Sequence, residues 1–184
     1  MPITKLDDVA GLVVIDLQKG IVSLPTVHPT GEIIERAARM VRAFRKRGLP
    51  VVLVNVTGGA PGRTDAAAPK YTRPPDWAQF VAELEPQAGD YVVSKQSWGA
   101  FHGTPLDGYL RQRGVTQILL AGVATSIGVE STARSAYDLG YHVVLVTDAM
   151  TDRDAEAHRH TVEKIFPRMG ESGTTEDVLK LVEK

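Results

Sequence analysis

Residues 12–18 read Leu-Val-Val-Ile-Asp-Leu-Gln, a short apolar run that ends abruptly at a carboxylate. Similar runs occur at 51–56, 118–121 and 143–146, and a shorter one occurs at 91–93. The runs are nearly continuous rather than alternating, and most of them are rich in Val. This pattern is typical of strands that are buried on both faces of a parallel sheet.

Helical patterns lie between these runs. Apolar residues from Ile33 to Phe44 repeat at helical spacing, and Gly48 and Pro50 mark the end of that helix. Further helices are expected at 106–113, 129–139, 154–166 and 176–182, the last capped by Thr174 or Thr175. Strands that alternate with helices predict a three-layer, doubly wound α/β domain, with a mostly parallel sheet and helices on both faces.

The composition is that of one globular domain spanning residues 1–184, because 184 residues is close to the usual size of a single domain. The 21 Lys and Arg residues are offset by 22 Asp and Glu residues, for a net charge of −1. This balance offers no cationic excess to nucleic acid or an anionic membrane, and no apolar run approaches the ~20 residues of a membrane span. We therefore expect a cytoplasmic protein that binds neither.

The sequence contains no cysteine. Disulfides, thiolate metal ligands and thiol nucleophiles are therefore excluded together.

Two charged residues follow expected strands, at the edge where doubly wound sheets bind their ligands. Asp16 ends the first run, where burial would raise the pKa of its carboxyl and suit it to proton transfer. Lys95 ends the run that begins at 91 and brings a cation to the same edge. The alternatives are that Asp16 caps a turn through backbone N–H groups and that Lys95 is a solvated surface lysine.

A third position at this edge is the segment 122–129, Gly-Val-Ala-Thr-Ser-Ile-Gly-Val, where a strand turns into a helix. Small residues here would let a ligand approach the N–H groups of the helix N-terminus, which favour negative charge. The alternative is tight packing of strand against helix. The segment after the first strand lacks the Gly-x-Gly-x-x-Gly spacing of a dinucleotide site.

Taken in order, these motifs resemble those of the isochorismatase-like hydrolase family over roughly residues 10 to 180. The residues that carry the resemblance are Val14–Gln18, Ser94 with Lys95, Ala100 with Phe101, 104–106, 122–129, Thr132, Ala136 and 146–149. The resemblance implies that Asp16 and Lys95 are the first two members of a catalytic set of Asp, Lys and Cys. It also implies a cis peptide bond between Val123 and Ala124, and a homo-oligomer, either a dimer or a tetramer.

The third catalytic position of the family corresponds to Gly128, which has no nucleophile. Family members that hydrolyse amides need a thiolate for a covalent intermediate, so we expect that activity to be absent. Isochorismatases also lack the cysteine, because cleavage of a vinyl ether needs an acid and water. A serine nucleophile is a less favoured alternative, since Ser126 and Ser131 are offset from position 128 and no histidine base is evident.

This chain departs from the family pattern in two segments, and these departures bear on the expected substrate and on the expected metal. Isochorismatases of siderophore and phenazine pathways carry an aromatic residue and a histidine where this chain has Ala124–Ser126, which puts isochorismate itself in question. Nicotinamidases carry acidic and histidine metal ligands after the second strand, whereas this chain has Thr57–Gly62 there. We therefore predict no catalytic metal and no other cofactor.

The expected site comprises catalytic Asp16, Lys95 and Gly128, together with the substrate-binding residues Gln18, Trp98, Phe101, Val123, Ala124 and Thr125. Arg63 and Arg73 are candidates to bind substrate carboxylates. They lie in the Gly- and Pro-rich segment 58–75, interpreted as an active-site lid or a subunit contact.

These observations favour a hydrolase that acts on a small, carboxylated molecule, with Asp16 as general acid and water as nucleophile. The alternative is a binding or scaffold protein that kept the fold and lost its chemistry with the cysteine.

Overall fold

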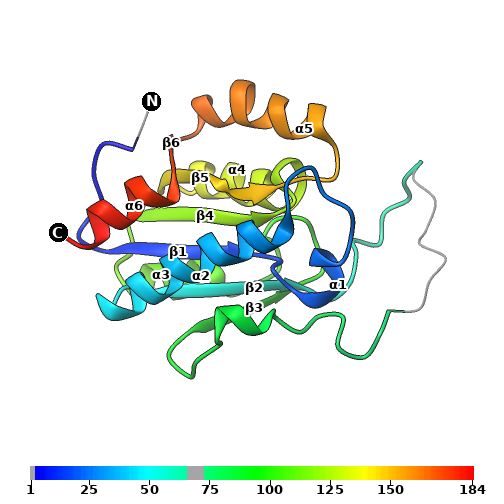
Figure 1. Ribbon diagram of the computed structural model, residues 1–184, viewed down its shortest axis with the longest axis horizontal. Coiled ribbons are helices and arrows are strands. Elements are labelled where there is room, and N and C mark those ends of the chain that lie inside the picture. The colour runs from blue at the N-terminus through cyan, green and yellow to red at the C-terminus, as the bar shows by residue number, and fades with distance from the viewer. Residues whose placement is uncertain (1–2, 66–72) are drawn as a thin grey trace.

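The computed structural model describes residues 3–65 and 73–184, which form a six-stranded parallel sheet with helices on both faces (Figure 1). The strands are β1 Ala10–Ile15, β2 Val51–Val56, β3 Tyr91–Lys95, β4 Gln117–Val123, β5 His142–Thr151 and β6 Glu171–Gly173. Their order across the sheet is β3-β2-β1-β4-β5-β6. The chain therefore changes direction between β1 and β4, where doubly wound sheets have their ligand crevice.

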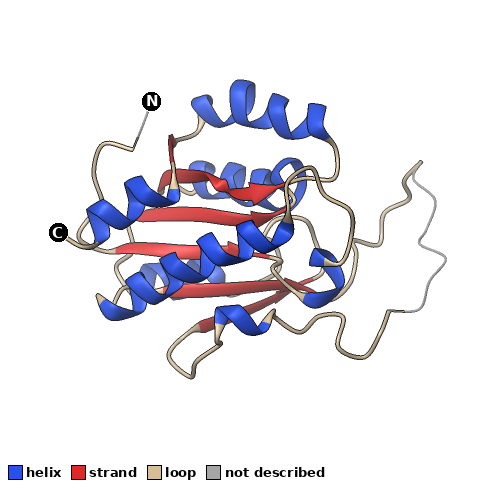
Figure 2. Ribbon diagram, in the orientation of Figure 1, coloured by secondary structure: helices blue, strands red, loops and turns tan. Residues whose placement is uncertain are grey.

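Helices cover both faces of the sheet (Figure 2), and an apolar cluster lies on each face. Helices α2, Thr30–Lys46, and α6, Thr175–Val182, pack on one face. Helices α3, Leu106–Gln112, and α4, Glu130–Asp138, pack on the other. Every residue of β1 and β4 is buried, which explains why their sequences are continuously apolar. The predicted fold class is confirmed.

Several boundaries differ from the prediction. The predicted helix at 154–166 consists of three consecutive segments: α5 Ala155–His160, a π turn at Thr161–Ile165 (η3) and a 3-10 turn at Phe166–Arg168 (η4). Pro167 lies inside the last turn rather than beyond it, where its missing N–H has no helical acceptor to lose. Thr174, rather than Thr175, caps α6.

Three short elements had no signal in the apolar pattern: α1 Lys19–Val22, the 3-10 turn η1 Ala82–Leu84, and the edge strand β6. Segment 58–75 includes 66–72, so the predicted lid or subunit contact lies partly outside the described residues. Within the described chain, no helix has both the length and the apolar character needed to cross a bilayer.

Candidate active site

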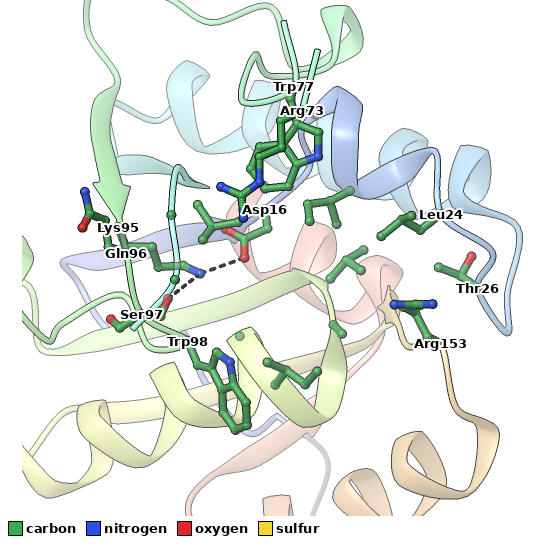
Figure 3. Close-up of a pocket in the computed structure, with 18 residues that line it drawn as sticks. Asp16, Leu24, Thr26, Arg73, Trp77, Lys95, Gln96, Ser97, Trp98 and Arg153 are labelled. Atoms are coloured by element: carbon green, nitrogen blue, oxygen red, sulfur yellow. Dashed lines mark hydrogen bonds and ion pairs between the residues drawn. The ribbon is translucent and has the colours of Figure 1, made fainter. Parts of the chain in front are cut away.

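The carboxyl ends of β1 and β3 bring Asp16 and Lys95 into contact (Figure 3). In the sheet Ile15 pairs with Val54, and Val56 pairs with Lys95, so the ends of the three strands meet at one edge. Lys95 Nζ donates to Asp16 Oδ2 at 2.8 Å and to the Ser97 carbonyl at 3.2 Å. Residues 79 positions apart in the chain thus form a buried ion pair.

The backbone of Asp16 leaves the sheet with a φ of 52°, in the left-handed region that Asp tolerates better than most residues. Its N–H still donates to the Val54 carbonyl at 2.9 Å, as a strand residue would. Its carbonyl accepts from the Gln18 N–H at 2.8 Å, which closes a tight turn. This turn directly after β1 places the Asp16 side chain at the edge of the sheet.

Burial raises the pKa of the Asp16 carboxyl from 3.8 to about 6, against the opposing effects of the charge and hydrogen bond of Lys95. The two carboxyl oxygens differ: Oδ2 accepts from Lys95, whereas Oδ1 is shielded from solvent and has no hydrogen-bond partner among the described residues. The group can therefore carry a proton close to neutral pH, which is the property expected of a general acid or base.

The end of β4 completes the edge beside β1. Gly122 has a φ of 121°, and a Cβ atom there would lie 2.0 Å from the Ile15 carbonyl oxygen, so only glycine fits against β1. The Val123–Ala124 peptide bond is cis, and the π turn η2, Thr125–Val129, follows it.

Gly128 lies within η2, directly against the Asp16 carboxyl. A Cβ atom on Gly128 would lie 3.3 Å from Asp16 Oδ2 and 3.0 Å from Ile15 Cγ2. The structure therefore brings Asp16, Lys95 and Gly128 to the wall of one cavity.

This cavity has a volume of about 380 Å³ and largely apolar walls. The larger apolar residues that line it are Ile21, Leu24, Val56, Trp77, Trp98 and Ile127. Among the described lining residues, only Asp16, Lys95, Arg73 and Arg153 carry a charge. Because Asp16 and Lys95 neutralise each other, the two arginines give the cavity a net positive character, which favours anionic ligands.

The predicted substrate-binding residues divide into two groups. Trp98, Val123 and Ala124 line the cavity, and the Trp98 side chain stands at its open side with 66% of the residue exposed (Figure 3). Gln18, Phe101 and Thr125 are absent from its walls.

The three residues outside the cavity are held by neighbours in the fold. Gln18 is fully buried, and its side-chain amide accepts from the Val56 N–H at 2.8 Å and donates to the Val56 and Trp77 carbonyls. Phe101 packs against Tyr141, and the buried hydroxyl of Thr125 is 2.9 Å from His158 Nδ1. Gln18 therefore supports the cavity wall that Trp77 provides, rather than presenting its own amide to a ligand.

Of the two arginines in the long loop, Arg73 lines the cavity and Arg63 does not. The Arg73 guanidinium stacks 4.3 Å from the Trp77 ring, and its Nη1 donates to the Thr57 carbonyl at 3.0 Å. These contacts position the cation while leaving most of its N–H donors for a ligand.

Arg153 was missed by sequence reasoning. The expected fifth strand ended at Val146, but β5 continues to Thr151, and its pairing with β4 shifts register between Leu120 and Gly122. The residues that follow this strand at the carboxyl edge of the sheet are therefore Asp152 and Arg153. Both oxygens of buried Asp152 accept backbone N–H groups, from Ser126 at 2.7 Å and from Arg153 at 2.7 Å, which ties Arg153 to the start of η2.

The remaining candidates lie elsewhere. Ser126 and Ser131 are not among the described residues that line the cavity. Within residues 3–65 and 73–184, no group of three or more His, Asp or Glu side chains is arranged to hold a metal ion.

The chain is a doubly wound α/β protein with a buried Asp–Lys pair at the edge of its sheet. Comparison with known proteins identifies the family. The isochorismatase domain family matches residues 10–177. The chain therefore belongs to the isochorismatase family of hydrolases.

Particular relatives show how far the similarity extends. An uncharacterized isochorismatase family protein of Bacillus subtilis, YwoC, is 47% identical over 93% of each chain. The solved structure of an isochorismatase family protein from Burkholderia thailandensis is 41% identical over 98% of each chain, with a TM-score of 0.93. The ureidoacrylate amidohydrolase RutB of Methylorubrum extorquens is 34% identical and matches 80% of this chain and 72% of its own length.

Proposed function

We propose that this protein hydrolyses the vinyl ether bond of a small, carboxylated molecule, with Asp16 as general acid and water as nucleophile. The observation that carries the proposal is a buried carboxyl whose pKa is raised to about 6, set beside Lys95 in a cavity where Gly128 supplies no nucleophile. An acid of this strength is well matched to proton transfer near neutral pH.

The reaction requires only groups that the cavity contains and a water molecule. Asp16 gives its proton to the terminal carbon of the vinyl group, and the positive charge develops on the carbon that bears the ether oxygen. Water adds to that carbon and returns a proton to the carboxylate. The resulting hemiketal collapses to a ketone and an alcohol, so that one water is consumed and Asp16 is regenerated. Lys95 holds Asp16 Oδ2 and balances the negative charge of the carboxylate.

RutB is named as an amidohydrolase, but we do not propose amide hydrolysis for this chain. Hydrolysis of an amide through a covalent intermediate needs an activated nucleophile, and the chain has no cysteine. Gly128 places no side chain against the Asp16 carboxyl, because a Cβ atom there would lie only 3.3 Å from Oδ2.

The two arginines support a carboxylated substrate, and Arg153 offers a clean test because the hydrogen bonds and ion pair of Asp16 and Lys95 among the described residues do not involve it. Arg153→Gln is expected to raise KM about 10- to 100-fold with little change in kcat, since a hydrogen bond to a charged group contributes about 1.5–3 kcal/mol to binding. The matched control is Arg113→Gln, an exposed arginine at the end of α3. An unchanged KM in Arg153→Gln would contradict this role.

The pH dependence of kcat/KM tests whether Asp16 acts as the general acid. The active form carries the proton on Asp16, so kcat/KM is expected to be highest below pH 6 and to fall as the pH rises through about 6. The measurement is a pH–rate profile for the best substrate from a screen of isochorismate, other carboxyvinyl ethers and simple amides. A rate that rises with pH over the same range would refute general acid catalysis by Asp16. Absence of turnover and of binding across the screen would favour a scaffold.

A further inference from the structure

We propose that the same cavity enolises small 2-oxo acids, exchanging the hydrogens on the carbon next to the ketone with those of water. The proposal goes beyond hydrolysis and does not depend on it. It rests on the placement of a base, a hydrogen-bond donor and an anion-binding pair around one apolar space.

The base is the Asp16 carboxylate. Asp16 lines the cavity, and Lys95 donates a single hydrogen bond to its Oδ2, so the carboxylate retains lone pairs that can take a proton. The group is largely buried: Oδ1 is shielded from solvent, and a Cβ atom on Gly128 would lie 3.3 Å from Oδ2. Shielding from water preserves the basicity of a carboxylate.

The donor is the Lys95 ammonium, which has three N–H groups. Two of them are used, at 2.8 Å to Asp16 Oδ2 and at 3.2 Å to the Ser97 carbonyl. Lys95 also lines the cavity, and no other described residue accepts a hydrogen bond from the ammonium, so its third N–H can be donated to a substrate oxygen. A cationic donor next to a base is the arrangement that stabilises an enolate while a proton leaves the neighbouring carbon.

The rest of the cavity suits a 2-oxo acid. Arg73 and Arg153 can bind the carboxylate, and apolar side chains such as Trp98 and Ile127 can contact the remainder of the molecule. Position 128 supplies no side chain to attack the ketone, so the carbonyl group survives in the site.

The exchange step balances without any added reagent. A proton moves from the carbon next to the ketone to the Asp16 carboxylate, the electron pair of the broken C–H bond forms a C=C bond, and the carbonyl electrons move to oxygen. The enolate oxygen accepts a hydrogen bond from Lys95. In heavy water the carboxyl exchanges its proton for a deuteron and returns the deuteron to carbon, which restores the ketone.

The pH dependence should oppose that of hydrolysis, because exchange needs Asp16 as a base. Burial raises the pKa of Asp16 to about 6, so exchange is expected to increase as the pH rises through about 6 and then to level. The other charged groups that face Asp16 in the described cavity are Lys95, Arg73 and Arg153.

The test follows the loss of the methyl signal of pyruvate, and of the methylene signal of phenylpyruvate, by proton NMR in deuterated buffer. The full-length protein is compared with Asp16→Asn and with Asp138→Asn, which removes an exposed carboxylate at the end of α4. The wild type and Asp138→Asn are expected to accelerate exchange over buffer alone. Asp16→Asn is expected to lower that acceleration about 100-fold or more.

The proposal would be overturned by the absence of any acceleration with the wild-type protein, or by acceleration that persists in folded Asp16→Asn. Exchange through an imine on Lys95 would also overturn it, and is detected as a covalent adduct by mass spectrometry after borohydride treatment with pyruvate. Hydrolysis is scored separately, by the alcohol released from vinyl ethers. Failure of one activity therefore does not imply failure of the other.

Discussion

Replacing Asp16 with asparagine is expected to lower kcat/KM for hydrolysis by about 10²- to 10⁴-fold, the usual contribution of a general acid. Asparagine has nearly the same shape and can still accept the hydrogen bond from Lys95 through its amide oxygen. It cannot donate a proton to carbon. The loss should therefore appear mainly in kcat, because shape and charge elsewhere in the cavity are unchanged.

The measurement is steady-state kinetics on the substrate found by the screen, with thermal unfolding of each variant to verify the fold. Asp138→Asn is the control, since it removes one carboxylate from an exposed position of α4. A folded Asp16→Asn protein with the wild-type kcat would remove Asp16 from the mechanism.

Replacing Gly128 with cysteine is expected to turn a protein without any thiol into one that iodoacetamide alkylates at a single site. The substitution is sterically accessible. The φ of Gly128 lies outside the left-handed range, and the tightest contacts of a new Cβ would be 3.0 Å to the Cγ2 methyl of buried Ile15 and 3.3 Å to Asp16 Oδ2. A shift of a few tenths of an ångström would relieve these contacts, in contrast to Gly122, where a Cβ would meet backbone at 2.0 Å.

The expected pKa of the new thiol follows from its neighbours. Lys95 lines the same cavity and favours the thiolate, whereas the Asp16 carboxylate, 3.3 Å from the Cβ position, opposes it. We expect the cation and the backbone N–H groups of η2 to prevail, because Asp16 can take up the thiol proton and become neutral. The pKa of the thiol should then lie below the usual value of about 8.5.

The pKa is measured from the pH dependence of the alkylation rate. The control is Gly108→Cys, an exposed glycine of α3 with open space around its Cα. A Gly128→Cys thiol that titrates at or above the Gly108→Cys value would show that the cavity does not activate a nucleophile, and would favour a scaffold. Weak amide hydrolysis by Gly128→Cys would be further support for an intact family site.

Much of the site was predictable because parallel strands end at a common edge. The run before Asp16 is apolar because every residue of β1 is buried, and a polar residue directly after such a run lies at the rim. Lys95 is the last residue of the edge strand β3, in which only Val93 and Lys95 are buried, and it reaches the same rim because β3 is parallel to its neighbour β2. The absence of cysteine excluded a thiol nucleophile without any coordinates. Composition and strand pattern are local properties, and they can be read from the chain alone.

The sequence pattern did not indicate side-chain direction or strand length. Gln18 lies two residues after Asp16 in the same turn, but the Asp16 side chain lines the cavity and that of Gln18 does not. Arg153 reaches the cavity because β5 continues to Thr151, five residues past Val146, with a register shift in its pairing with β4. Neither event leaves a periodic signal in the sequence.

The chain's own residues thus establish a parallel α/β domain, a carboxylate and an ammonium at its rim, and a glycine in place of a nucleophile. Three-dimensional packing establishes that Lys95 donates to one Asp16 oxygen, that the other oxygen has no partner among the described residues, and that Arg73 and Arg153 share their cavity. The reason is physical. Apolar burial follows from residue type and period, whereas a contact across 79 residues depends on register, backbone torsion and the exclusion of water, which exist only when the strands have assembled.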